Sequence, residues 1–246
     1  MYAWLVTTSP AFQRARSPAH KAERRQAILT AAAQLAARDG VRQVTLTDIA
    51  AAVGIHKSAL LRYFETREQI FLELTGRAWT EWAQATCGAL GDIAPLDASD
   101  DTARVLARAF AERPLLCDLI PHTALNLERH ASTEAVRAYK LTSLGAVERV
   151  ATALYGPLPD LGTEDRLQLV STIALLAGAI YQIATPPPEL AELYATDPHL
   201  AHALVDLEPR LARAAQVTIA GMRARPASRD GHMKAAGRHA GGGLSS

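Results

Sequence analysis

The sequence predicts an all-α protein, with a small N-terminal unit of three helices that contains a helix-turn-helix and a larger helical domain behind it. Apolar residues recur at helical spacing through most of residues 21–223, and no strand-like alternation persists long enough to predict a sheet. Glycine or proline follows most of these periodic stretches, as is typical of helix ends. The chain of 246 residues, 49% of them apolar, is long enough to bury a core in each of two domains.

The N-terminal unit begins with a predicted helix over residues 21–39, which ends at the glycine that follows. A second short helix is predicted by apolar residues at i, i+3, i+4 and i+7, namely Leu46, Ile49, Ala50 and Val53. Thr45 and Asp48 match a capping box, which places the start of this helix. Gly54 is expected to take a positive φ at its end, and Ile55 then turns inward between the second and third helices.

The third predicted helix covers residues 57–63 and follows the second across the glycine turn. Two short helices joined in this way are the layout that proteins use to place one helix in the major groove of DNA. Four side chains are left on the outer face of the third helix: Lys57, Ser58, Arg62 and Tyr63. The pattern therefore indicates a DNA-binding unit over residues 21–66.

The charge of the chain is distributed unevenly. Residues 12–70 carry a net charge of +5, residues 71–222 carry −8 and residues 223–246 carry +4, within an overall net charge of +1. Excess cations on the proposed DNA-binding end would neutralise phosphates and release counterions. Such an excess also fits an ordinary solvated surface, so the charge supports the motif without replacing it.

The larger domain is predicted over residues 67–223 as a series of helices. Thr66 and Gln69 match a second capping box and open a helix that runs to about residue 90. Pro114 suits the first turn of a later helix, which Pro121 must kink or divide. After the first long helix, the expected helices cover residues 100–112, 114–127, 132–155, 163–185 and 207–222.

The last part of the chain allows two interpretations. Either a helix starts at Asp197-Pro198 and is interrupted by Pro209, or a new helix follows Asp206 as its cap and holds Pro209 in its first turn. At the two ends of the chain, residues 1–20 are expected to form a flexible basic arm and residues 224–246 a disordered tail.

The N-terminal unit resembles the DNA-binding half of the TetR family of one-component bacterial repressors, from about Arg24 to Leu72. The resemblance is carried by the order and spacing of these segments: Asp39-Gly40, Thr45 to Ala50, Val53-Gly54-Ile55, Leu60 to Phe64, and Thr66-Arg67-Glu68. It implies that residues 57–63 form the recognition helix and that the segment after Gly40 helps to hold the DNA backbone. The DNA-facing residues predicted on this basis are Thr45, Thr47, His56, Lys57, Ser58, Ala59, Arg62, Tyr63 and Arg67.

Three residues depart from the family pattern. Leu61 stands where the family usually has an aromatic residue against the phosphates, and Tyr63 is a partial substitute. His56 replaces the serine that caps the recognition helix. Arg67 replaces the usual lysine after this helix and keeps its charge, so we expect it to remain a DNA contact.

The resemblance also implies a homodimer. In the family the last two long helices pack with those of a second subunit into a four-helix bundle, which assigns residues 163–185 and 207–222 to dimerisation. Small residues at four-residue spacing would let two helix backbones approach closely, and the predicted interface residues are Ala174, Gly178 and Tyr181. The alternative is that both helices are core helices of a monomer.

In the family a ligand pocket lies among the middle helices, which implies that a small-molecule inducer binds here. The candidate lining residues in that region are Trp79, Trp82, Cys117, His122, Asn126 and Tyr139. His122 and Asn126 are four residues apart and would share one helix face, where two polar groups could orient a small molecule. Taken singly, each candidate also fits an ordinary role in the core or at the surface.

Several other functions are disfavoured by the sequence. Cys87 and Cys117 form neither a disulfide framework nor a CxxC metal pair, which fits a reducing cytoplasm, and no metal or cofactor is expected. Polar residues interrupt the apolar run of residues 167–184, so a buried helix at a subunit interface explains it better than a membrane span. No Gly-rich phosphate loop, GxSxG or HExxH motif supports an enzyme.

We therefore expect a cytoplasmic, ligand-responsive transcriptional repressor that binds double-stranded operator DNA as a homodimer. Two alternatives stay open: a helical DNA-binding accessory protein without a ligand, and a helical enzyme in which the helix-turn-helix serves packing alone. A cavity of roughly several hundred Å³ in the larger domain would favour the ligand-responsive protein.

Overall fold

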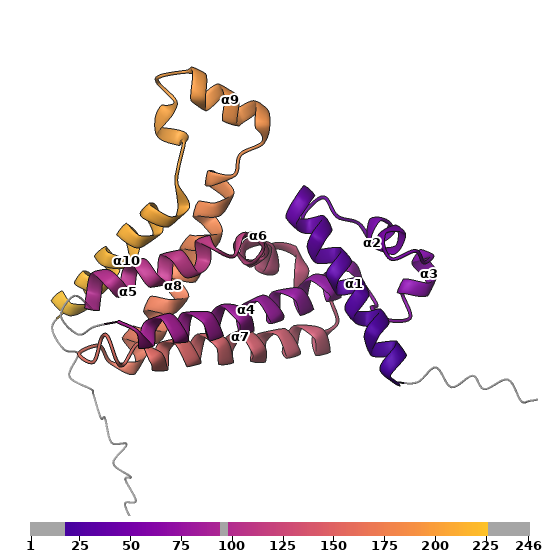
Figure 1. The fold of residues 1–246 in the computed structure, drawn as a ribbon, viewed down its shortest axis with the longest axis horizontal. Coiled ribbons are helices and arrows are strands. Elements are labelled where there is room, and N and C mark those ends of the chain that lie inside the picture. Colours follow the sequence, from indigo (N-terminus) through magenta and orange to yellow (C-terminus); the bar gives the residue numbers. More distant parts are fainter. Residues whose placement is uncertain (1–17, 94–97, 226–246) are drawn as a thin grey trace, which may run out of the picture.

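The computed structural model describes residues 18–93 and 98–225, and all regular secondary structure in these ranges is helical (Figure 1). The predicted all-α fold is thereby confirmed. The helices are α1 Pro18–Asp39, α2 Leu46–Ala52, α3 Lys57–Leu60, α4 Arg67–Gly91, α5 Ala98–Ala111, α6 Pro114–His122, a π-helical turn Thr123–Leu127, α7 Thr133–Ala153, α8 Thr163–Ala184, α9 Pro188–Thr196, a 3-10 turn Ala201–Ala203 and α10 Leu207–Ala224. Most of the predicted arm and tail lies outside the described residues.

The N-terminal unit consists of α1, α2, α3 and the first turns of α4, with α1 to α3 gathered at one end of the molecule (Figure 1). Its core holds fully buried side chains from each of these helices: Ile28 and Leu29 of α1, Ile49 of α2, Leu60 of α3 and Phe71 of α4. Because the start of α4 packs in this core and its remainder packs in the larger domain, one continuous helix joins the two parts without a linker.

The larger domain packs its long helices side by side: α4 lies along α7, and α5 lies along α10 (Figure 1). The helix α8 packs against α6, α7 and α10. An aromatic cluster is buried in the core of the larger domain. There the Trp82 ring stacks on Phe110 with centroids 4.8 Å apart, and the Trp79 ring meets Trp82 edge-on at 5.2 Å. Such ring pairs stabilise a core beyond the area that they bury.

The helix α6 and the π-helical turn after it connect the two cores. Cys117 is buried in the core of the larger domain, whereas Leu119, only two residues later, is buried in the N-terminal core. Pro121 is predicted to kink or divide this helix, and the chain does change form there, because α6 ends one residue later and the π-helical turn Thr123–Leu127 follows. This connection places one short helix in contact with both domains.

Residues 186–206 leave the bundle between α8 and α10 and carry α9 beyond it (Figure 1). Neither α9 nor the 3-10 turn contains a buried residue. The sequence does not predict α9, because the three prolines read as a stop; Pro188 instead starts this helix, where its missing N–H is no loss. Pro209 lies in the first turn of α10, which confirms that a new helix follows Asp206, although the Asp206 side chain makes no capping hydrogen bond.

Candidate nucleic-acid interface

The first helix of the motif, α2, is fixed at its start by reciprocal hydrogen bonds. The backbone N–H of Asp48 donates to Thr45 Oγ1 at 3.2 Å, and the backbone N–H of Thr45 donates to Asp48 Oδ2 at 2.9 Å, as the predicted capping box requires. Hydrogen bonds from Thr45 also lower the pKa of Asp48. The Thr45 hydroxyl is thus engaged in the cap, whereas Thr47, on the first turn of the helix, is exposed to solvent.

The turn between α2 and α3 takes the predicted form. Gly54 has φ +66°, a conformation that glycine adopts without steric cost. The backbone N–H of Ile55 donates to the carbonyl oxygen of Ala50 at 3.0 Å and closes the end of α2. Ile55 also packs against the N-terminal core, so the start of α3 is held at a defined angle.

The helix α3 presents a short polar face to solvent. It begins at Lys57 as predicted, but its last turn tightens, because the N–H of Tyr63 donates to the carbonyl oxygen of Leu60, three residues earlier, at 2.8 Å. Leu60 and Phe64 are buried on the inner side. Of the side chains predicted to face DNA here, the exposed ones are His56, Lys57, Ser58 and Arg62, and the partly buried ones are Ala59 and Tyr63.

Arg67 does not belong to this exposed face. Its guanidinium donates hydrogen bonds to the backbone carbonyl oxygens of Val41 and Val44, pairs with Glu68 at 3.2 Å and lies over the Phe71 ring, 4.6 Å from the centroid. Only 17% of the side chain is exposed. The Arg67 donors hold the α1–α2 loop against α4, and the expected contact of Arg67 with DNA stays a prediction.

A second arginine, which the sequence pattern does not single out, ties the recognition segment to α4. The Arg25 guanidinium donates to the carbonyl oxygen of Tyr63 at 2.6 Å, lies 3.9 Å from the centroid of the Phe64 ring and forms an ion pair with Glu73. Glu73 also pairs with Arg77 at 2.9 Å. No local pattern could reveal this cluster, since Arg25 lies 38 and 48 residues from its two hydrogen-bond partners.

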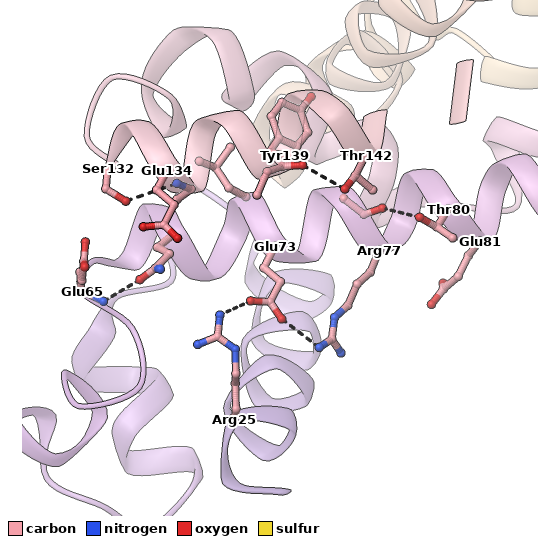
Figure 2. Close-up of a pocket in the computed structure, with 15 residues that line it drawn as sticks. Arg25, Glu65, Glu73, Arg77, Thr80, Glu81, Ser132, Glu134, Tyr139 and Thr142 are labelled. Carbon is pink, nitrogen blue, oxygen red and sulfur yellow. Dashed lines mark hydrogen bonds and ion pairs between the residues drawn. The ribbon is translucent and has the colours of Figure 1, made fainter. Parts of the chain in front are cut away.

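A groove of about 570 Å³ lies beside this cluster, between α1, α4 and α7. Figure 2 shows the Arg25–Glu73–Arg77 ion pairs in its wall and Tyr139 and Thr142 on the α7 side. The residues that line it are Arg25, Glu65, Gln69, Leu72, Glu73, Gly76, Arg77, Thr80, Glu81, Ser132, Glu134, Ala135, Ala138, Tyr139 and Thr142. The groove thus touches both the DNA-binding unit and the larger domain.

Of the residues predicted to line a ligand pocket, Tyr139 alone lines this groove. Trp79, Trp82 and Cys117 are buried in the core of the larger domain, and burial raises the pKa of the Cys117 thiol to about 12. His122 and Asn126 do not sit on a common α-helical face, because the π-helical turn begins between them. In the described part of the chain, no group of three or more His, Cys, Asp or Glu residues is placed to hold a metal ion.

Two of the three predicted dimer residues face the interior of their own chain, and the third, Tyr181, is half-buried against the core. Ala174 and Gly178 are buried, and a Cβ atom built on Gly178 would lie 2.9 Å from Pro121 Cδ of α6. The close approach of small residues therefore joins α8 to α6 within one chain, and the assignment of Ala174 and Gly178 to the subunit contact is wrong. Elsewhere on its surface, α8 exposes 68% of Leu175 and 52% of Ile183.

Two family models match almost all of the described chain. Residues 28–74 match the model described as bacterial regulatory proteins, tetR family, and residues 76–226 match the model of the tetracyclin repressor-like C-terminal domain. The chain belongs to the TetR family. The boundary between the two matched regions falls within α4, which this TetR-family chain shares between its two cores.

Similar proteins include a named transcriptional repressor and solved regulators of the same fold. The HTH-type transcriptional repressor BepR of Brucella suis is 44% identical over 63 residues, which are 26% of this TetR-family chain and 30% of BepR, so the match spans about a third of that relative. The fatty acid degradation regulator FadR of Bacillus halodurans has the same fold, with TM-score 0.52, 15% identity and coverage of 80% of this chain and 99% of that one. FadR of Thermus thermophilus, solved with lauroyl-CoA, has TM-score 0.54, 16% identity and coverage of 82% and 97%.

Proposed function

We propose that this TetR-family protein is a cytoplasmic transcriptional repressor, without enzymatic activity, that binds operator DNA as a homodimer and is released by a small molecule. The observation that carries the proposal is the rigid α2–turn–α3 motif, whose capped first helix and anchored glycine turn leave Lys57 and Arg62 exposed together. Two short helices in this arrangement place the second one in the major groove.

The two exposed cations of the motif have distinct surroundings that suit them to DNA. Neither Lys57 nor Arg62 forms an ion pair among the described residues, so both charges are available to phosphates or base edges. Their backbone is held from behind by Leu60 and by the Arg25 bond to the carbonyl of Tyr63. A helix that is supported in this way presents its polar face at a fixed orientation, as base recognition requires.

We place the dimer contact on the exposed face of α8 and on the neighbouring α10. Leu175 and Ile183 of α8 and Val217 of α10, which is 56% exposed, would remove apolar surface from water on contact with a second copy. Among the described helices, α8 is the one that is long and apolar enough to span a membrane by length and composition alone.

A small-molecule ligand is proposed by analogy with the fold relatives, of which the Thermus thermophilus FadR is solved with lauroyl-CoA. The ligand of this protein would act on the larger domain and shift the dimer toward a state whose two recognition helices no longer match the operator. The part of Trp79, Trp82, Cys117, His122 and Asn126 in this binding stays a prediction. A buried Asn126 Oδ1 atom without a hydrogen-bond partner is the observation that favours this region.

Selection of bound DNA from a random double-stranded pool tests the proposal. We expect enrichment of a palindrome, because a two-fold dimer sets its recognition helices about 34–36 Å, or a multiple of this, apart along the DNA. Sequencing of the bound fraction gives the half-sites and their spacing. Failure to enrich any sequence would contradict the proposal, and enrichment of one unrepeated site would contradict the dimer.

A further inference from the structure

We propose that the groove between α1, α4 and α7 is an effector site for an organic cation, which acts on the recognition segment by competing with Arg25 for Glu73. The regulatory half of this inference rests on the function proposed above, whereas the binding half does not. Three observations carry the proposal: the charges that line the groove, the apolar floor of the groove, and the contacts of Arg25.

The lining of the groove carries more negative than positive charge. Its carboxylates come from Glu65, Glu73, Glu81 and Glu134, and its guanidinium groups come from Arg25 and Arg77. Both arginines are paired with the same carboxylate, that of Glu73. Glu65, Glu81 and Glu134 form no ion pair among the described residues, and they lie toward opposite ends of the groove in Figure 2. A ligand with a positive charge would therefore find unpaired carboxylates.

The floor of the groove is suited to an apolar body. Leu72 and Gly76 of α4 and Ala135, Ala138 and Tyr139 of α7 line it. Gly76 lets α4 and α7 approach closely at this floor, since a Cβ atom at this position would contact Thr142 Cγ2 at 3.5 Å. The volume of about 570 Å³ lies within the usual range of small-molecule sites, roughly 300–1,000 Å³. The occupant that these features fit is an aromatic or aliphatic amine.

Arg25 links this groove to the DNA-binding face. The guanidinium divides its interactions among Glu73, the carbonyl oxygen of Tyr63 and the Phe64 ring. A cation that approaches Glu73 weakens the attraction between this carboxylate and Arg25. The end of the recognition segment then loses part of its tie to α4, while the cap and the glycine turn at its start are untouched. Binding is thus expected to loosen α3 and lower affinity for DNA.

Isothermal titration calorimetry with two probes of one ring system tests the binding half. We expect 1-naphthylmethylamine, a cation at pH 7, to bind one site per chain, and 1-naphthylacetate, an anion, to bind roughly tenfold more weakly or not at all. The double variant Glu65→Gln, Glu134→Gln should weaken binding of the amine roughly threefold or more. The variant Glu148→Gln, at an exposed position of α7 outside the groove, should not. Absent or charge-independent binding, or an unchanged double variant, would overturn the site.

The regulatory half is tested with labelled DNA from the selection described above. The amine should lower DNA affinity in the parent protein and should do so less in the Glu73→Gln variant, in which there is no carboxylate to compete for. If the amine binds in calorimetry and DNA affinity stays unchanged, the coupling through Arg25 is wrong. If the protein without any probe binds no DNA, the proposed function fails, and the calorimetric result on the groove stands by itself.

Discussion

The arginines around the recognition helix divide into two kinds by what their guanidinium groups contact. Arg62 is exposed and forms no ion pair among the described residues, whereas Arg25 and Arg67 donate to backbone carbonyls and carboxylates and lie over aromatic rings of the same chain. A planar fork with several donors suits such divided bonding better than a lysine does. Positive charge near the motif is therefore not equivalent to contact with DNA.

The contacts of Arg67 predict that this side chain stabilises the fold. Arg67→Ala should lower the free energy of unfolding by about 2–3 kcal/mol, because it removes charged hydrogen bonds to two backbone carbonyls that remain partly buried. Arg62→Ala serves as the control and should stay within about 0.5 kcal/mol of the parent, as exposed substitutions usually do. Urea denaturation followed by circular dichroism measures both, and equal stability of the two variants would contradict the structural role of Arg67.

A histidine between the two domains predicts a dependence of stability on pH. Burial lowers the pKa of His122 below its ordinary value. The negative charge of Asp118 opposes this change, and the positive charges of Arg67 and Arg42 add to it. The unfolded chain therefore binds the proton more readily, so stability is lost as the pH falls through the ordinary histidine range, about 6.5, toward the lower folded pKa. The urea midpoint should fall between pH 8 and pH 5.5, and it should fall less in His122→Gln. An identical pH response of the two proteins would contradict this account.

At the scale of single elements, α8 has two faces with opposite roles. The face that carries Gly178 is closed against α6, where a Cβ atom on this residue would lie 2.9 Å from Pro121 Cδ and 3.0 Å from Ile120 Cγ2. The other face leaves Leu175 and Ile183 in solvent. Small residues therefore mark an internal contact here, and large apolar residues mark the surface that we propose for the second subunit.

Substitutions on these two faces should separate stability from association. Gly178→Ala should lower the free energy of unfolding by about 1–3 kcal/mol, the usual cost of overpacking, with the chain still dimeric. Leu175→Glu should leave the unfolding of the isolated chain nearly unchanged and shift the protein toward monomer. Sedimentation velocity over a dilution series, together with thermal unfolding, distinguishes the two effects. Dissociation by Gly178→Ala with no effect of Leu175→Glu would reverse the assignment.

The elements that sequence predicts well are those set by neighbouring residues. The capping box at Thr45, the positive φ at Gly54 and the start of α3 depend on contacts within a few residues, and all three are confirmed. The π-helical turn after α6, the start of α9 on Pro188 and the direction of Gly178 depend on packing between distant segments. Spacing alone cannot reveal these, because a helical pattern does not say which partner covers a face.

In the candidate site too, sequence predicts the features that neighbouring residues set and misses the contacts between distant segments. The exposed residues of α3 follow from the pattern of Leu60 and Phe64, whereas the bonds from Arg67 to Val41 and Val44 join segments more than 20 residues apart and leave no local signal. Arg25 and the groove beside it join segments of α1, α4 and α7. Local sequence carries no signal for such a junction.

On the scale of the whole molecule, the DNA-binding unit is connected to α8 through one carboxylate. Asp118 Oδ2 accepts a hydrogen bond from the backbone N–H of Val41 at 2.8 Å, and Asp118 Oδ1 accepts one from Gln182 Nε2 at 2.8 Å. Val41 lies in the loop that Arg67 also holds, and Gln182 lies in the last turn of α8, beside the exposed Ile183. With α4 shared between both cores, these bonds make the position of the recognition helix depend on the arrangement of the larger domain.

The central claim, that the exposed face of α3 reads DNA, is tested most directly by a fluorescence anisotropy titration of the selected operator. Lys57→Ala and Arg62→Ala should each weaken binding by about 1–3 kcal/mol, or roughly 5- to 150-fold in Kd, and leave thermal unfolding unchanged. Arg149→Ala, at an exposed position of α7 away from the motif, should bind as the parent does. Parent-like affinity of both Lys57→Ala and Arg62→Ala would contradict the claim.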